Sequence, residues 1–256
     1  MKVIFLVIRE GHMTKTKKSI VMVAFAVLLL CGCNKSSKTI IRLQKMEEGV
    51  GSPTTEAELK EAIKKYQDRI YDIQLAQGQI GIWYKMLGTR QLDAKMYGEA
   101  LDSFQKAIQF YPANQNLFYW VGVCAGYMAK ASLDFKASGA TTSERYNYLK
   151  LAESAYLRAI ELDERYGRAL YGLAIIYIYE LGESAKGIPY LERFLDIEKR
   201  NTDAMFRLAE AYYLNYDFDK AADLYDQIIS LTKDEKKKAL AEQNKKTVLD
   251  AAYNNR

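Results

Sequence analysis

The stretch Gly81–Asn114 reads GIWYKMLGTRQLDAKMYGEALDSFQKAIQFYPAN and decides the expected fold. Small and apolar residues recur in it at helical spacing, in two segments: Tyr84, Leu87 and Gly88, then Ala100, Phe104 and Ala107. Pro112 follows the second segment, where a helix is expected to have ended. A helix–turn–helix unit of about 34 residues is the period of a solenoid, which buries its core by stacking such units.

The same pattern returns from Gln115, from Gly167 and from Thr202. It resembles the tetratricopeptide repeat (TPR) family, which places an aromatic residue at position 4, Leu-Gly or Leu-Ala at 7 and 8, and Ala at 20. That family also has an aromatic residue at 24, Ala at 27 and Pro at 32. The resemblance implies an all-α fold, a right-handed α-solenoid of four TPR helix pairs over residues 81–232. Gln91 stands at position 11, where the family has Tyr, and Phe194 stands where Ala is usual.

Two of the repeats carry insertions. Ala125 and Ala152 are 27 residues apart where the family has 9, so 18 residues are inserted, and we expect a helical hairpin at about 129–146. Repeat three has one extra residue between its helices. Pro189 is tolerable in a first helical turn, so the second helix of this repeat is expected to start near Ala185.

A helix is expected on each side of the repeats. Thr55 and Glu58 form a capping-box pattern that starts a helix over 56–80, and Gly78 and Gly81 are expected to break it from the first repeat. Its apolar positions are Leu59, Ala62, Tyr66 and Ile70. Two interpretations stay open, the second helix of an incomplete repeat and a simple N-terminal packing helix.

The C-terminal helix, residues 233–256, is expected to cap the solenoid. A capping box of Thr232 and Glu235 starts it, and its lysine-rich surface suits a solvated end. Its expected contacts are Leu240, Val248, Leu249 and Ala251. Attraction of the lysines to membrane headgroups is the alternative.

The N-terminus predicts export and lipidation. Lys15, Lys17 and Lys18 precede the uncharged segment Ile20–Leu30, which is too short to span a bilayer but suits a signal peptide. The sequence that follows resembles a bacterial lipobox with Cys33 as the lipidated residue. We expect a signal peptide at 1–32, with translation starting at Met13, and a lipidated, flexible tether at 33–55. An ordinary secretory signal or a short membrane anchor is the alternative.

Removal of this leader changes the charge and the chemistry of the chain. The leader holds five basic residues and one acidic residue, so the net charge of +5 falls to +1. A balanced chain lacks the basic footprint of a nucleic-acid-binding protein. The leader also contains His12, the only histidine, and Cys124 lies in an apolar run typical of a buried cysteine. We therefore expect no enzyme activity, no cofactor and no metal.

A ligand is expected on the concave face, which the first helices of successive repeats line in the TPR family. The fifth repeat position would form an aromatic ladder of Tyr119, Tyr171 and Phe206 after Lys85. The candidate groove residues are Lys85, Asn116, Tyr119, Tyr127, Arg168, Tyr171, Tyr179, Phe206 and Tyr213. Tyrosine suits recognition because it buries a large area with few rotors. The alternative is that these tyrosines pack against a terminal helix folded into the groove.

These features favour a membrane-anchored, periplasm-facing scaffold or adaptor of the cell envelope, in the inner or outer membrane. Its partner would be another envelope protein or peptide segment in the groove, or an apolar small ligand. The sequence is also similar to TPR lipoproteins that accompany TRAP-type solute transporters, where a groove or pore holds an apolar organic acid. A further relative is the TPR lipoprotein of the outer-membrane β-barrel assembly machine.

Overall fold

The computed structural model describes Ile41, residues 53–132 and residues 141–255. The predicted signal peptide, Cys33 and the turn of the predicted hairpin at 133–140 lie outside these residues. The chain forms two compact units, Met1–Asp72 and Ile73–Arg256. The helices are α3 (Glu56–Asp93), α4 (Tyr97–Phe110), α5 (Gln115–Ala131), α6 (Thr141–Leu162), α7 (Gly167–Ile175), η1 (Ile176–Glu180), α8 (Ser184–Ile197), α9 (Thr202–Leu214), α10 (Phe218–Leu231) and α11 (Glu235–Asn254).

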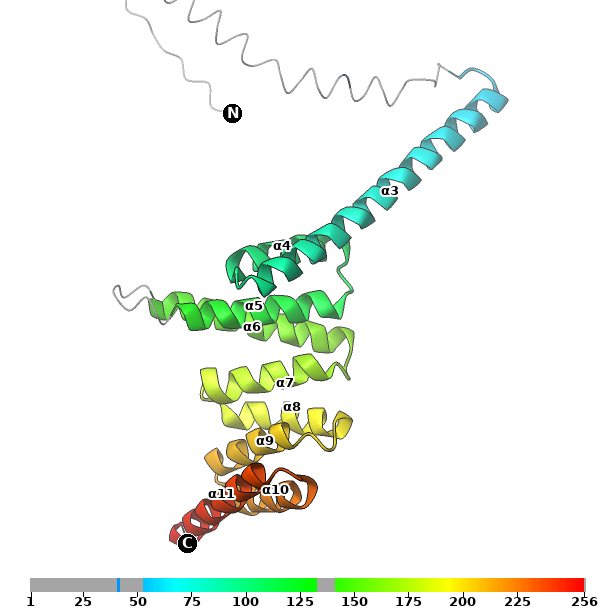
Figure 1. The fold of residues 1–256 in the computed structure, drawn as a ribbon. Helices are drawn as coiled ribbons and strands as arrows, with labels where there is room; N and C mark the ends of the chain where they lie inside the picture. The colour runs from blue at the N-terminus through cyan, green and yellow to red at the C-terminus, as the bar shows by residue number, and fades with distance from the viewer. Residues whose placement is uncertain (1–40, 42–52, 133–140, 256) are drawn as a thin grey trace, which may run out of the picture. The chain divides into compact units, whose positions relative to one another are not determined.

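The second unit is an α-solenoid. From α4 to α11, each helix packs on its neighbours along the chain, and Figure 1 shows these helices stacked in sequence order. Three clusters of buried side chains follow one another along this stack. The predicted all-α solenoid is thereby confirmed.

Large rings set against glycines hold neighbouring helices together. Tyr156 of α6 is 5% exposed and lies between Gly122 of α5 and Gly172 of α7. A Cβ atom would lie 2.6 Å from the Tyr156 ring at Gly122 and 2.8 Å from it at Gly172. The ring therefore occupies space that any larger residue at either glycine would take, and it joins repeat two to repeat three.

The first helix begins as predicted but does not break. Thr55 N–H donates to Glu58 Oε2 (2.9 Å), and Glu58 N–H donates to Thr55 Oγ1 (3.3 Å), which is the predicted capping box. These bonds and those from Thr54 lower the pKa of Glu58 to about 2. The predicted break at Gly78 and Gly81 was wrong, because α3 is continuous through both.

The two glycines serve close packing instead. A Cβ atom at Gly81 would lie 2.6 Å from Phe110 Cβ and from the Tyr111 ring, so the missing side chain makes room for the end of α4. The Tyr111 hydroxyl also donates to the Gly78 carbonyl (2.8 Å). Glycine lowers helix propensity, but here the space it leaves decides its role.

The extra residue of repeat three is absorbed in a π-helical turn. In η1 the Leu181 N–H donates to the Ile176 carbonyl, five residues back (3.0 Å). The wider turn accommodates one residue more than an α-helix does. It places Ile178, 4% exposed, against Gly187 of α8, where a Cβ atom would lie 2.6 Å from Ile178 Cγ1.

Pro189 lies deeper in its helix than predicted. Helix α8 begins at Ser184, one residue from the predicted Ala185. Pro189 is therefore its sixth residue and falls in the second turn, so the expected first-turn placement was wrong. Because proline has no N–H, the carbonyl of Ala185 has no donor four residues later.

The cap of α11 also differs from the prediction. The Asp234 side chain accepts from the N–H groups of Lys236 (2.9 Å) and Lys237 (3.3 Å), while Thr232 Oγ1 accepts from the Asp234 N–H (3.2 Å). The predicted box of Thr232 and Glu235 was therefore wrong. A carboxylate nearer the first turn satisfies two free N–H groups at once.

The packing residues of α11 were predicted in part. Val248 is buried as expected, and Ala241, which was not expected, is fully buried. Leu240 and Leu249, which were also expected as contacts, are 48% and 50% exposed and do not belong to the buried core. Within the described ranges, none of the helices is both long enough and apolar enough to cross a membrane.

The close approach of α5 and α6 can be tested with two glycines of one helix. We expect Gly122→Ala to lower the free energy of unfolding by about 1–3 kcal/mol, because its Cβ overlaps the buried Tyr156 ring. Gly126→Ala is the control, since no atom lies within 4 Å of its Cβ position. The control should be neutral or stabilising by about 0.5–1 kcal/mol. Urea unfolding followed by circular dichroism measures both, and equal effects would contradict the packing argument.

Candidate binding groove

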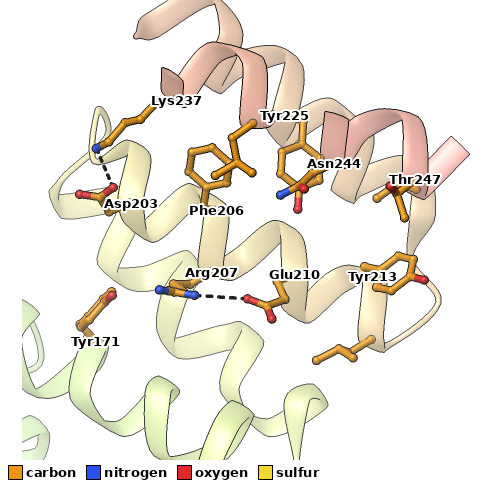
Figure 2. A pocket seen from close by; sticks show the side chains of 13 residues that line it. Tyr171, Asp203, Phe206, Arg207, Glu210, Tyr213, Tyr225, Lys237, Asn244 and Thr247 are labelled. Atoms are coloured by element: carbon orange, nitrogen blue, oxygen red, sulfur yellow. Dashed lines mark hydrogen bonds and ion pairs between the residues drawn. The ribbon is translucent and has the colours of Figure 1, made fainter. Parts of the chain in front are cut away.

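A pocket of about 530 Å³ lies in the second unit between α7, α9, α10 and α11. Figure 2 shows side chains from these helices converging on it. Its lining residues are Tyr171, Asp203, Phe206, Arg207, Glu210, Tyr213, Leu214, Tyr225, Lys237, Leu240, Asn244, Thr247 and Val248. This volume is typical of pockets that take a small molecule or a few side chains.

Aromatic rings form the floor of the pocket. Phe206 of α9 meets Tyr225 of α10 edge to face, with ring centroids 5.9 Å apart, and Asn244 of α11 lies beside Tyr225 in Figure 2. Tyr171 of α7 contacts the ring of Phe194 on its other side (5.2 Å). Rings held by neighbouring rings lose little entropy on binding, so this floor is preorganised for an apolar group.

Charged pairs of opposite sign border the floor. Lys237 Nζ of α11 lies 2.7 Å from Asp203 Oδ1 of α9, and both pairs in this rim are drawn in Figure 2. Arg207 Nη1 lies 3.5 Å from Glu210 Oε2 and 3.3 Å from the Tyr179 hydroxyl. The rim thus holds two basic and two acidic side chains, so it favours neither an anionic nor a cationic ligand.

The Tyr179 hydroxyl ties the π-helical turn to α9. It donates to Glu210 Oε2, and the Arg207 guanidinium lies over its ring, 5.4 Å from the centroid. Burial and the bond to Glu210 raise the pKa of Tyr179. The hydroxyl therefore stays protonated at neutral pH and holds Glu210 as an acceptor, so that the carboxylate keeps a fixed position in the rim.

The structure divides the nine candidate residues. Tyr171, Phe206 and Tyr213 line the pocket, and Tyr179 borders it through Arg207. The residues that do not line it are Lys85, Asn116, Tyr119, Tyr127 and Arg168.

The residues outside the pocket have other neighbours. Tyr119 contacts the rings of Tyr156 and Tyr166 (6.0 and 5.8 Å), and burial raises its pKa. The Tyr166 hydroxyl donates to Asn116 Oδ1 (2.8 Å). Tyr127 stacks on Tyr97 with centroids 4.4 Å apart. The tyrosines near repeat two therefore pack against one another, away from the pocket.

Helix α11 supplies one wall of the pocket. Lys237, Leu240, Asn244 and Thr247 line the pocket from this helix, which was expected either to cap the solenoid or to pack as a terminal helix in the groove. Their spacing of three, four and three residues places them on one helical face. This spacing was the sequence signal for a shared face. Leu240 is half exposed because that face borders the pocket and not the core.

One segment of the chain matches a known protein family. Residues 179–236 match the tetratricopeptide repeat model. This segment begins at the last two residues of η1, contains α8, α9 and α10, and includes the floor residue Phe206. Among curated proteins, a "TPR repeat-containing protein" of Borreliella burgdorferi (strain ATCC 35210 / DSM 4680 / CIP 102532 / B31) is 24% identical over 225 residues. The alignment covers 87% of this chain and 92% of that protein.

Solved structures of TPR proteins share the fold. The crystal structure of MamA aligns with a TM-score of 0.50 and 20% identity over 73% of this chain and 98% of that one. YrrB, described as a TPR protein with an unusual peptide-binding site, aligns with a TM-score of 0.50 and 19% identity over 80% and 88%. MamA from Desulfovibrio magneticus RS-1, from residue 41 to its end, aligns with a TM-score of 0.52 and 13% identity. The alignment covers 67% of this chain and 90% of that one.

The one cysteine in the described ranges lies away from the pocket, in the interior. Cys124 is fully buried, and burial raises the pKa of its thiol to about 12. Thiols react as thiolates, so we expect Cys124 to be alkylated by iodoacetamide at pH 8 roughly 100-fold more slowly in the folded protein than in urea. Peptide mass mapping separates it from Cys31 and Cys33. Fast labelling of the folded protein would contradict a structural role.

Proposed function

We propose that this chain is an adaptor that binds a segment of another protein in the pocket between α7, α9, α10 and α11, without catalysis. The aromatic floor carries the proposal, because Tyr171 and Phe206 line it with partly exposed rings and the buried Tyr225 holds Phe206 edge to face. The charges in the rim balance, which suits an uncharged side chain of the bound segment. We infer that the bound segment presents one large apolar or aromatic side chain to the floor.

Two observations support a peptide as the ligand. Asn244 and Thr247 line one wall. The Thr247 hydroxyl donates to the Gln243 carbonyl (3.2 Å) and the Asn244 side chain hydrogen-bonds with Tyr225, so each offers its remaining hydrogen-bonding capacity to a peptide backbone. YrrB, which has the same fold, is described as having a peptide-binding site. Among the described residues no cluster of His, Cys, Asp and Glu is placed to hold a metal ion.

The two half-exposed leucines of α11 provide a matched test. Leu240 lines the pocket and Leu249 does not, yet both are about half exposed on the same helix. Short peptides selected from a random library against the full chain should bind Leu240→Asp at least about 10-fold more weakly, because a charge then faces the apolar floor. Leu249→Asp should bind them as the unchanged protein does.

Fluorescence anisotropy measures these affinities, and circular dichroism checks that both variants fold. Phe206→Ala is a second variant that removes part of the floor itself, and it should also weaken binding. Selected peptides that bind all variants equally would place the interface elsewhere on the chain, and the pocket assignment would then fail.

A second candidate is an apolar small ligand. The pocket volume of about 530 Å³ lies within the usual range for small-molecule sites. Native mass spectrometry of the purified protein would then show a retained small molecule, and Leu240→Asp would lose it.

We also propose that the chain is a lipoprotein of the bacterial cell envelope, anchored through Cys33 with its solenoid facing the periplasm. The order of basic run, apolar segment and Gly32–Cys33 in the sequence supports this proposal. A tether at 33–55 would let the pocket reach a partner at a distance from the membrane.

Cysteine substitutions test the anchor. We expect Cys33→Ser to abolish incorporation of an alkyne-labelled fatty acid, because the acyl acceptor is gone. Cys31→Ser is the matched control, two residues away, and should remain labelled and in the membrane fraction. Labelling of the Cys33→Ser protein would contradict the proposed site.

A further inference from the structure

Helix α3 carries a heptad pattern that the binding pocket does not use. Seven positions alternate in steps of four and three residues: Leu59, Ile63, Tyr66, Ile70, Ile73, Gln77 and Ile80. We call this set the α3 seam. Two seam positions per seven residues over three heptads, all apolar or aromatic except Gln77, form the pattern of a helix that pairs with another long helix. Helix α3 has 38 residues, whereas α6, the next longest of the described helices, has 22.

The α3 seam is exposed in the described chain. Its large aliphatic side chains are exposed by 47% at Leu59, 56% at Ile63, 54% at Ile70 and 48% at Ile73. A helix gains most of its stability from packing its apolar face, so a row of exposed isoleucines at regular spacing indicates a missing neighbour.

Charged side chains surround the first heptads of the α3 seam. Glu61 and Lys65 pair on the face away from the seam (3.0 Å), and Glu56 and Lys60 pair beside its first residue, Leu59 (2.6 Å). Acidic and basic side chains alternate there, with Asp68 following. A helix that lies on an anionic membrane normally has a basic polar face and a broad apolar one. The narrow seam and mixed charges favour a protein neighbour.

We propose that the α3 seam pairs in parallel with the same seam of a second copy of this chain. The identical helix matches the seam in length and spacing. In a parallel pair each a-position residue faces its own copy, so Gln77 faces Gln77 and the two amides can hydrogen-bond. In an antiparallel pair Gln77 would face an apolar residue, which leaves a polar group unpaired at the seam.

Contacts of α3 with α4 begin at Gly78, near the end of the seam. Beyond Ile80, the next glycines face α4: Gly81 lies against Phe110, and Gly88 lies 2.9 Å, at its Cβ position, from the Phe104 ring. No seam residue lines the pocket of α7, α9, α10 and α11. Self-association is therefore independent of the proposed ligand binding, and either can fail alone.

Cysteine cross-linking of the full chain in native membranes tests the pairing and its direction. Residues facing each other in a parallel pair lie within the roughly 7 Å Cα separation that a disulfide can bridge. We expect Ile63→Cys and Ile70→Cys each to give a disulfide-linked dimer under mild oxidation. Asp68→Cys, on the outer face, should remain monomeric. An antiparallel pair would link at most one of the two seam positions and would overturn the proposed direction.

A charge substitution tests the seam with a matched control. Ile70 (54% exposed) is in the seam, and Leu75 (55% exposed) lies on another face of the same helix. Light scattering of the detergent-solubilised protein should give a mass of at least two chains, unchanged by Leu75→Asp and reduced to one chain by Ile70→Asp. Three results would each overturn the proposal: one chain for the unchanged protein, equal effects of the two variants, or absent cross-links with Ile70→Asp weakening binding to phosphatidylglycerol vesicles.

Discussion

The solenoid depends on how closely its helices approach, and rings set against glycines fix that distance. Tyr156 shows the constraint most directly, because its ring lies against Gly122 within one repeat and Gly172 of the next. Protein interiors are packed densely, so a contact of this kind fixes the position of both helices. A contact of the same kind, between Ile178 and Gly187 of α8, follows in the next repeat.

The solenoid itself could be predicted from the sequence, because the helix pair of each repeat has a similar spacing of small and large residues. The errors were local and have one cause. A short sequence motif often admits two roles, and only three-dimensional neighbours choose between them. Gly81 was read as a helix break and is a close contact, while Asp234 rather than Thr232 caps α11. Periodicity locates elements but does not say which of two adjacent polar residues binds a free N–H.

The pocket could be predicted only in part for a related reason. Repeat positions identify residues that recur, and Tyr171, Phe206 and Tyr213 were found in that way. Helix α11 is not a repeat, so no family position says where its side chains point. Its contribution, and the charged pair of Lys237 with Asp203, depend on how the last helix crosses the first helix of repeat four.

The π-helical turn η1 limits how far these repeats are interchangeable modules. A consensus repeat would lack the extra residue, and deleting it would turn the following side chains by about 100° around the helix axis. The Tyr179 hydroxyl would then lose its hydrogen bond to Glu210, and Ile178 would lose its packing contact with Gly187. Engineering of this protein by exchanging repeats is therefore constrained: η1 links repeat three to repeat four, and Tyr156, set between Gly122 and Gly172, links repeat two to repeat three.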